Sequence, residues 1–94
     1  MSAPKGVKKV PPKKAVALKY DASKDNAPRV VAKGEGLLAE RILALAKEAG
    51  IPIKKDAPLI EALWKVELER EIPPELYEAV AAVLAWAWHL EGKV

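Results

Sequence analysis

Residues 15–32, AVALKYDASKDNAPRVVA, contain two short apolar runs that are separated by a polar loop. In the first run, Val16, Leu18 and Tyr20 share one face and the opposite face is also largely apolar, which is typical of a strand covered on both sides. The second run, residues 29–32, contains two adjacent β-branched valines, which favour a strand. The loop is rich in turn-forming residues. This stretch therefore predicts two short strands.

Apolar residues at helical spacing follow these strands and predict three helices. The first helix is expected over residues 37–49, because Gly50 suits the left-handed residue that ends a helix and Pro52 blocks its continuation. A second helix is expected after Asp56, which can cap its N-terminus, with Pro58 in its first turn. The apolar stripe of the first helix consists of Leu38, Ile42, Leu45 and Ala49, with Leu37 beside it.

The last helix is expected after the Pro-Pro pair at residues 73–74, where acidic residues favour a helix N-terminus. Between the first two helices, Ile51 and Ile53 alternate around a proline, which predicts a third short strand at a strand start or a sheet edge. The resulting order, strand-strand-helix-strand-helix-helix, predicts an α+β (or α/β-like) fold with a small mixed sheet of three or four strands surrounded by helices. The expected buried face of the last helix consists of Leu76, Val80, Val83, Leu84, Ala87 and Trp88.

The formal charge of +3 conceals an asymmetry along the chain. Residues 1–33 carry nine basic and two acidic side chains, a net of +7, whereas residues 34–94 carry seven and eleven, a net of −4. Residues 1–14, MSAPKGVKKVPPKK, have too little apolar surface to offset the entropy of ordering. We therefore expect a flexible basic arm over residues 1–14 and one folded domain over residues 15–94.

Composition excludes several kinds of chemistry. The 94 residues include no cysteine, threonine or glutamine, so disulfides, thiolate metal sites and cysteine nucleophiles are excluded and hydroxyl nucleophiles are scarce. The lone histidine, His89, has no second His or Cys to share a metal ion with, and it is expected to be a helix-terminal or surface residue. No apolar run approaches the ~20 residues of a membrane span, and the start lacks the apolar region of a signal peptide. We expect a cytoplasmic protein without a cofactor or a metal ion.

The three tryptophans differ in their expected burial. Trp64 and Trp88 lie on apolar stripes and are expected in the core. Trp86 lies off the main stripe of the last helix, so it is expected to be partly exposed and to belong to a partner surface.

Five ordered blocks of the sequence resemble the cytoplasmic domain of the FlhB family, the export-switch proteins of flagellar and type III secretion systems. The resemblance covers residues 11 to about 90. It implies a small mixed sheet surrounded by helices, and a role in binding export-apparatus proteins or export substrates. The blocks are AVALKYD (15–21), APRVVAKG (27–34), LLAERILALAKEAGIPI (37–53), DAPLIEALWK (56–65) and EIPPELYEAVAAVLAW (71–86).

The motif that gives the family its chemistry is missing. Members carry Asn-Pro-Thr-His followed by Tyr directly before the first of these blocks, and they cleave themselves between the Asn and the Pro. In that reaction the Asn side-chain amide attacks its own backbone carbonyl, forms a cyclic imide and expels the proline nitrogen. Val10 has no nucleophilic atom, and Lys13 replaces the motif's His, so we expect no self-cleavage and no enzymatic activity. The five positions are held here by Val10, Pro11, Pro12, Lys13 and Lys14.

The sequence thus predicts a soluble, free-standing, non-cleaving homologue of the export-switch domain that acts by protein–protein contact. Its candidate contact residues are Val10, Pro11, Pro12, Lys13, Lys14 and Trp86. The alternative is a small basic nucleic-acid-binding protein that uses residues 1–33, although no aromatic residue lies within the basic arm and no RNA-binding signature accompanies it, so specific readout is unsupported. One asparagine and eight prolines give a composition like that of thermophile proteins. The partner and the oligomeric state stay open.

Overall fold

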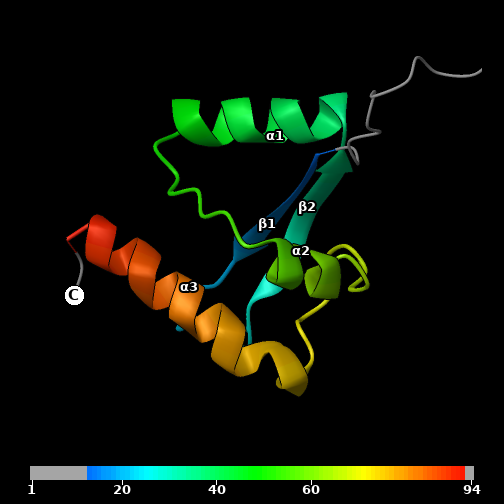
Figure 1. The fold of residues 1–94 in the computed structure, drawn as a ribbon. Helices are drawn as coiled ribbons and strands as arrows, with labels where there is room; N and C mark the ends of the chain where they lie inside the picture. The colour runs from blue at the N-terminus through cyan, green and yellow to red at the C-terminus, as the bar shows by residue number, and fades with distance from the viewer. Residues whose placement is uncertain (1–12, 93–94) are drawn as a thin grey trace, which may run out of the picture.

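The computed structural model describes residues 13–92 and has a mixed α+β architecture, which confirms the fold class expected from the sequence (Figure 1). Two strands come first, and three helices follow them along the chain. The elements are β1 (Lys14–Lys19), β2 (Arg29–Glu35), α1 (Leu37–Glu48), α2 (Ala57–Leu63) and α3 (Tyr77–Leu90), with a single 3₁₀ turn (Pro74–Leu76) leading into α3.

Strands β1 and β2 form a two-stranded antiparallel sheet. Ala15 lies opposite Gly34 and Ala17 lies opposite Ala32, but the register shifts after Ala17 so that Leu18 lies opposite Val30. The extra residue on β2 is a β-bulge, which increases the local twist of the pair. The sheet is therefore antiparallel and smaller than the mixed sheet of three or four strands that was expected.

The third strand predicted around Pro52 is wrong, since residues 51–53 form no strand. The Ile51 N–H donates to the Ala46 carbonyl (2.8 Å) and the Gly50 N–H donates to the Lys47 carbonyl (3.1 Å), which together close the C-terminus of α1 as a Schellman motif. Pro52 has no N–H to donate. Two of the three donors that a strand would need are thus unavailable for a sheet ladder.

The sheet lies between α1 on one face and α2 with α3 on the other (Figure 1). A Cβ atom on Gly34 would come within 2.5 Å of Leu38 Cγ and 2.9 Å of Ile42 Cδ1, so α1 crosses the sheet where glycine leaves room. On the opposite face, Val16 and Leu18 pack against the main core. The buried residues of this core are Val30, Leu59, Leu63, Val66, Ile72 and Val80.

The predicted helix ends are confirmed. Helix α1 ends at Glu48, one residue before the predicted end, and Gly50 adopts a left-handed φ of 73° directly after the C-cap residue Ala49. Asp56 caps α2, because its Oδ1 accepts a hydrogen bond from the Leu59 N–H at 3.1 Å, and Pro58 lies in the first turn. Short-range signals in the sequence thus determine where the helices begin and end.

The burial of two of the three tryptophans, Trp64 and Trp88, differs from expectation. Trp88 is 38% exposed rather than buried, because the C-terminal turns of α3 extend beyond the sheet (Figure 1). Trp64 is half-buried rather than in the core, and lysine side chains cover its ring. Trp86 is half-buried, and His89 is exposed in the last turn of α3. Among residues 13–92, no helix is both long enough and apolar enough to cross a membrane.

Candidate protein-binding site

The contact residues predicted from the sequence fall in separate places. Residues 10–12 lie outside the described residues. Lys13 is exposed directly before β1, and its carbonyl accepts a hydrogen bond from the Gly36 N–H at 2.7 Å. Trp86 lies on α3, with Lys54 Nζ 5.1 Å from the centroid of its ring. Of these residues, Lys13 and Trp86 thus have different partners, on the loop before α1 and on the segment before α2.

Lys14 has a structural role that the sequence did not indicate. Its Nζ lies 2.9 Å from Glu61 Oε2 on α2 and 5.1 Å from the centroid of the Trp64 ring. Lys33, from β2, lies 5.8 Å from the same ring and donates to the carbonyls of Trp64 (3.0 Å) and Val66 (2.7 Å). A cation is favoured beside the free carbonyls at a helix C-terminus. Through these contacts, Lys14 connects β1 and Lys33 connects β2 to the C-terminal part of α2 and the residues that follow it.

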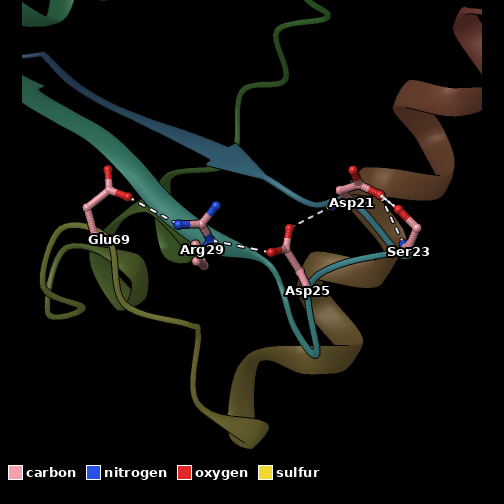
Figure 2. Close-up of polar contacts among 5 residues, drawn as sticks. All are labelled: Asp21, Ser23, Asp25, Arg29 and Glu69. Atoms are coloured by element: carbon pink, nitrogen blue, oxygen red, sulfur yellow. Dashed lines mark hydrogen bonds and ion pairs between the residues drawn. The ribbon is translucent and has the colours of Figure 1, made fainter.

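A polar network holds the loop between the strands, residues 20–28, in one shape (Figure 2). Asp21 Oδ1 accepts hydrogen bonds from the Ser23 hydroxyl (2.6 Å) and the Ser23 N–H (3.0 Å), and these bonds lower the pKa of Asp21. The Asp21 N–H donates to Asp25 Oδ2 at 2.8 Å. The backbone of this turn is thereby hydrogen-bonded to the aspartate side chains within the turn.

Arg29 connects this loop to the segment before α3. Its Nε lies 3.7 Å from Asp25 Oδ1, and its Nη1 donates to Glu69 Oε2 at 3.2 Å (Figure 2). The Glu69 N–H in turn donates to the Val30 carbonyl at 2.7 Å, and the Ile72 N–H donates to the Pro28 carbonyl at 2.9 Å. The loop is thus fixed against the chain that leads into α3.

This arrangement creates an apolar pocket of about 240 Å³ between the loop and α3. The four lining residues that belong to α3 are spaced by three or four positions along the chain, so they share one face of the helix. Tyr77 is 46% exposed at the rim, and Ala27 is buried at the base. We call this the loop–α3 pocket; its lining residues are Tyr20, Asn26, Ala27, Pro28, Tyr77, Ala81, Leu84 and Trp88.

Sequence reasoning missed this pocket for a physical reason. Leu84 packs against the core as expected, but Trp88 was also assigned to the core because the same stripe of α3 contacts the core at Val80 and then continues past the sheet. The available signal was the length of that stripe, which exceeds what two short strands can cover. Within residues 13–92, no group of three or more His, Asp or Glu side chains is placed to hold a metal ion.

Comparison with known proteins places the chain in a family. The sequence pattern of the FlhB HrpN YscU SpaS family matches residues 10–87. The uncharacterized protein YlqH of Bacillus subtilis (strain 168) is 44% identical over 84 residues, which cover 89% of this chain and 90% of YlqH. The flagellar biosynthetic protein FlhB of Escherichia coli (strain K12) is 49% identical over 78 residues. That match covers 82% of this chain but 20% of FlhB, so the chain spans about a fifth of the FlhB proteins it matches.

Solved structures agree with the sequence comparison. A crystal structure of a mutated EscU C-terminal domain superposes with a TM-score of 0.79 at 28% identity, covering 82% of this chain and 94% of that domain. The cytoplasmic domain of FlhB from Shewanella putrefaciens gives a TM-score of 0.77 at 41% identity, covering 80% of this chain and 63% of that structure. The chain therefore belongs to the FlhB HrpN YscU SpaS family and corresponds to the cytoplasmic, C-terminal domain of its members.

Proposed function

We propose that this chain works in the cytoplasm in type III or flagellar protein export, where it binds export-apparatus proteins or export substrates by protein–protein contact. Membership in the export family supports the setting. The loop–α3 pocket is the single observation that carries the binding role. We also propose that the chain does not cleave itself, because Val10 cannot perform the attack that the family's Asn performs.

The pocket has the properties of a site for a protruding side chain of another protein. Two of its aromatic residues, Tyr77 and Trp88, are exposed, and exposed aromatic side chains around an apolar hollow are typical of the residues that dominate binding energy at interfaces. Its volume of about 240 Å³ is below the ~300–1,000 Å³ of small-molecule sites. The pocket therefore suits an apolar side chain of a peptide segment, and three of its lining residues, Tyr20, Asn26 and Tyr77, carry side-chain hydrogen-bonding groups.

Filling the pocket tests this proposal. Ala81 is exposed and lines the pocket, so Ala81→Trp should fill it without disturbing the core. Purified export substrates and export-apparatus proteins of the source cell would be titrated onto the immobilised chain, and the affinity measured by biolayer interferometry. We expect Ala81→Trp to weaken binding at least about tenfold, a change of about 1.4 kcal/mol.

The matched control is Ala82→Trp. Ala82 is the next residue of α3, is also exposed and does not line the pocket, so its replacement should leave the affinity unchanged. Circular dichroism would show that both variants keep the helical content of the parent chain. Equal binding by the parent chain and by Ala81→Trp would exclude the loop–α3 pocket as the contact site.

A further inference from the structure

Glu69 holds a backbone conformation that side chains disfavour. Its φ is 68°, and among the described residues it is the only one other than glycine with a positive φ. It is the third residue of a turn that is closed by the Arg70 N–H, which donates to the Glu67 carbonyl at 3.2 Å. Turns with a positive φ at this place favour glycine or asparagine. Glutamate therefore carries a conformational cost here that glycine would avoid.

The side chain of Glu69 reaches across to the start of β2. Its Oε2 accepts a hydrogen bond from Arg29 Nη1 at 3.2 Å, and within residues 13–92 the Arg29 side chain makes no other hydrogen bond (Figure 2). The Glu69 side chain is 66% exposed, and an ion pair with so exposed a partner adds little stability. The pair therefore does little to offset the cost of the Glu69 conformation. Its effect is on where the guanidinium of Arg29 lies.

Arg29 makes the contact that joins the preceding loop to the sheet. Within residues 13–92, the hydrogen bonds of residues 21–25 all stay inside the loop, and the ion pair from Asp25 to Arg29 is the one polar contact that leaves it. The Asp25 side chain is 13% exposed, so water screens this contact less than it screens the contact with Glu69. Asp25 also accepts the Asp21 N–H at 2.8 Å, which extends the contact to the start of the turn.

These contacts end at the loop–α3 pocket. Tyr20 and Asn26 flank the turn, and both line the pocket. Pro28 also lines it, and this end of the loop is held by the backbone, because the Ile72 N–H donates to the Pro28 carbonyl at 2.9 Å. The Asn26 end has no such bond among the described residues and depends on the side-chain contacts that lead to Arg29. A shift of that end would move one wall of the pocket relative to α3.

We propose that Glu69 and Arg29 are positioning residues for the loop–α3 pocket. Glu69 places the Arg29 guanidinium, and Arg29 holds the loop in the shape that admits an apolar side chain between the loop and α3. This inference rests on the binding function proposed for the pocket. A site whose binding-competent shape is only partly populated binds its ligand more weakly by that fraction. Loss of the Glu69 contact therefore weakens binding without loosening the core.

Glycine at position 69 separates positioning from stability. Glu69→Gly removes the contact with Arg29 and at the same time relieves the backbone. We expect its Tm, measured by calorimetry, to equal or exceed that of the parent chain, while its affinity for a pocket ligand falls about fivefold. A purely structural role would lower both together. Glu69→Gln keeps a side-chain oxygen that accepts from Arg29, and it should retain most of the affinity.

The matched control is Glu67→Gly. Glu67 belongs to the same turn and is exposed, and its carboxylate lies 3.8 Å from Arg70 rather than beside the loop. Its replacement should lower the Tm slightly, because glycine adds freedom to the unfolded chain, and it should leave the affinity unchanged. Equal weakening of binding by Glu67→Gly and Glu69→Gly would overturn the proposal.

The pocket ligand in this test is N-acetylphenylalaninamide, which presents an aromatic side chain on a capped peptide unit. It is titrated into the ¹⁵N-labelled full chain, and the Kd is taken from the shifts of the Ala81 and Leu84 amide signals, since both residues line the pocket. In the Arg29→Met background, adding Glu69→Gly should cause no further loss, because Glu69 acts through Arg29. Additive losses from the two substitutions would overturn the proposal.

Solvent exchange of amide protons, measured by NMR on the free chain, tests the positioning without a ligand. The Asp21 N–H, which donates to Asp25, should exchange at least about fivefold faster in Glu69→Gly than in the parent chain, and at the parent rate in Glu67→Gly. Unchanged exchange in Glu69→Gly would overturn the proposal. If the probe binds neither the parent chain nor any variant, the function proposed for the pocket fails, whereas the exchange rate still decides whether Glu69 positions the loop.

Discussion

Gly34 determines how closely helix α1 approaches the sheet. Its φ is outside the left-handed region, so alanine could adopt its backbone conformation, yet an added Cβ would lie 2.5 Å from Leu38 Cγ. The contact rather than the backbone therefore accounts for the glycine. Gly50 is the opposite case, since its φ is 73° and nothing lies within 4 Å of an added Cβ.

This contrast predicts different responses to the same substitution. Gly34→Ala should lower the free energy of unfolding by about 1–3 kcal/mol through overpacking, and Gly50→Ala by about 1–2 kcal/mol through backbone strain. Urea unfolding measures both. Adding Leu38→Ala should recover part of the loss in Gly34→Ala and none in Gly50→Ala, because it removes the contact but not the strain. Equal recovery in the two backgrounds would contradict this assignment.

Val10 predicts that the chain stays intact. A branched hydrocarbon side chain has no nitrogen to attack the residue's own backbone carbonyl, so prolonged incubation at neutral pH should leave a single intact mass by mass spectrometry. The variant Val10→Asn/Pro12→Thr/Lys13→His, which restores the family's four motif residues, is the positive control and is expected to release a fragment that begins at Pro11. Release of that fragment from the unaltered chain would contradict the proposal.

At the scale of elements, the sequence predicted the helix caps and helix ends correctly. It did not predict which element would use a backbone N–H group that two elements could both use. The cap at Asp56, the first-turn proline Pro58 and the helix end at Gly50 depend on neighbours within a few residues, and all three are confirmed. The strand expected around Pro52 failed because the Ile51 N–H is used by the end of α1. The periodicity of apolar residues does not show which of two neighbouring elements a backbone N–H group will hydrogen-bond to.

The candidate site was harder to predict than the fold. The apolar stripe of α3 indicates burial, but it does not show where the sheet stops covering it, and Trp88 lies beyond that point. Lys14 was expected to face a partner, whereas it is bound to Glu61 and the Trp64 ring. Both outcomes depend on tertiary placement, which the spacing of residues along the chain does not encode.

The cap of α2 yields a prediction at this scale. Asp56→Ala removes the acceptor of the Leu59 N–H, and it should lower the free energy of unfolding by about 1 kcal/mol, within a range of about 0.5–2 kcal/mol. Asp56→Asn, which keeps a side-chain oxygen acceptor, is the matched control and should lose little. Urea denaturation followed by circular dichroism measures both. An equal loss in the two variants would indicate that the charge of Asp56, rather than its hydrogen bond, stabilises the helix.

The whole molecule combines a small core with exposed apolar surface. The core cluster of buried residues joins β2, α2, the segment before α3 and α3, while α1 lies on the far face of the sheet with Leu38 and Leu45 more than half exposed. A protein of this size that exposes so much apolar surface gains stability if binding covers that surface.

Proline restricts the unfolded state and is expected to add to the thermal stability that the core provides. The sequence has eight prolines, and Pro58 and Pro74 lie in the first turns of helical segments, where proline fits without loss of a hydrogen bond. The described ion pairs contribute little, because each involves at least one side chain that is more than a tenth exposed and most involve a partner that is more than half exposed.

We expect a Tm above about 60 °C by calorimetry, at the upper end of the mesophile range. Pro58→Ala should lower the free energy of unfolding by about 0.4–1 kcal/mol and the Tm by several degrees, whereas raising the salt concentration should change the Tm little. A Tm below about 60 °C, or a large fall in Tm with added salt, would show that surface charge rather than chain restriction stabilises the fold.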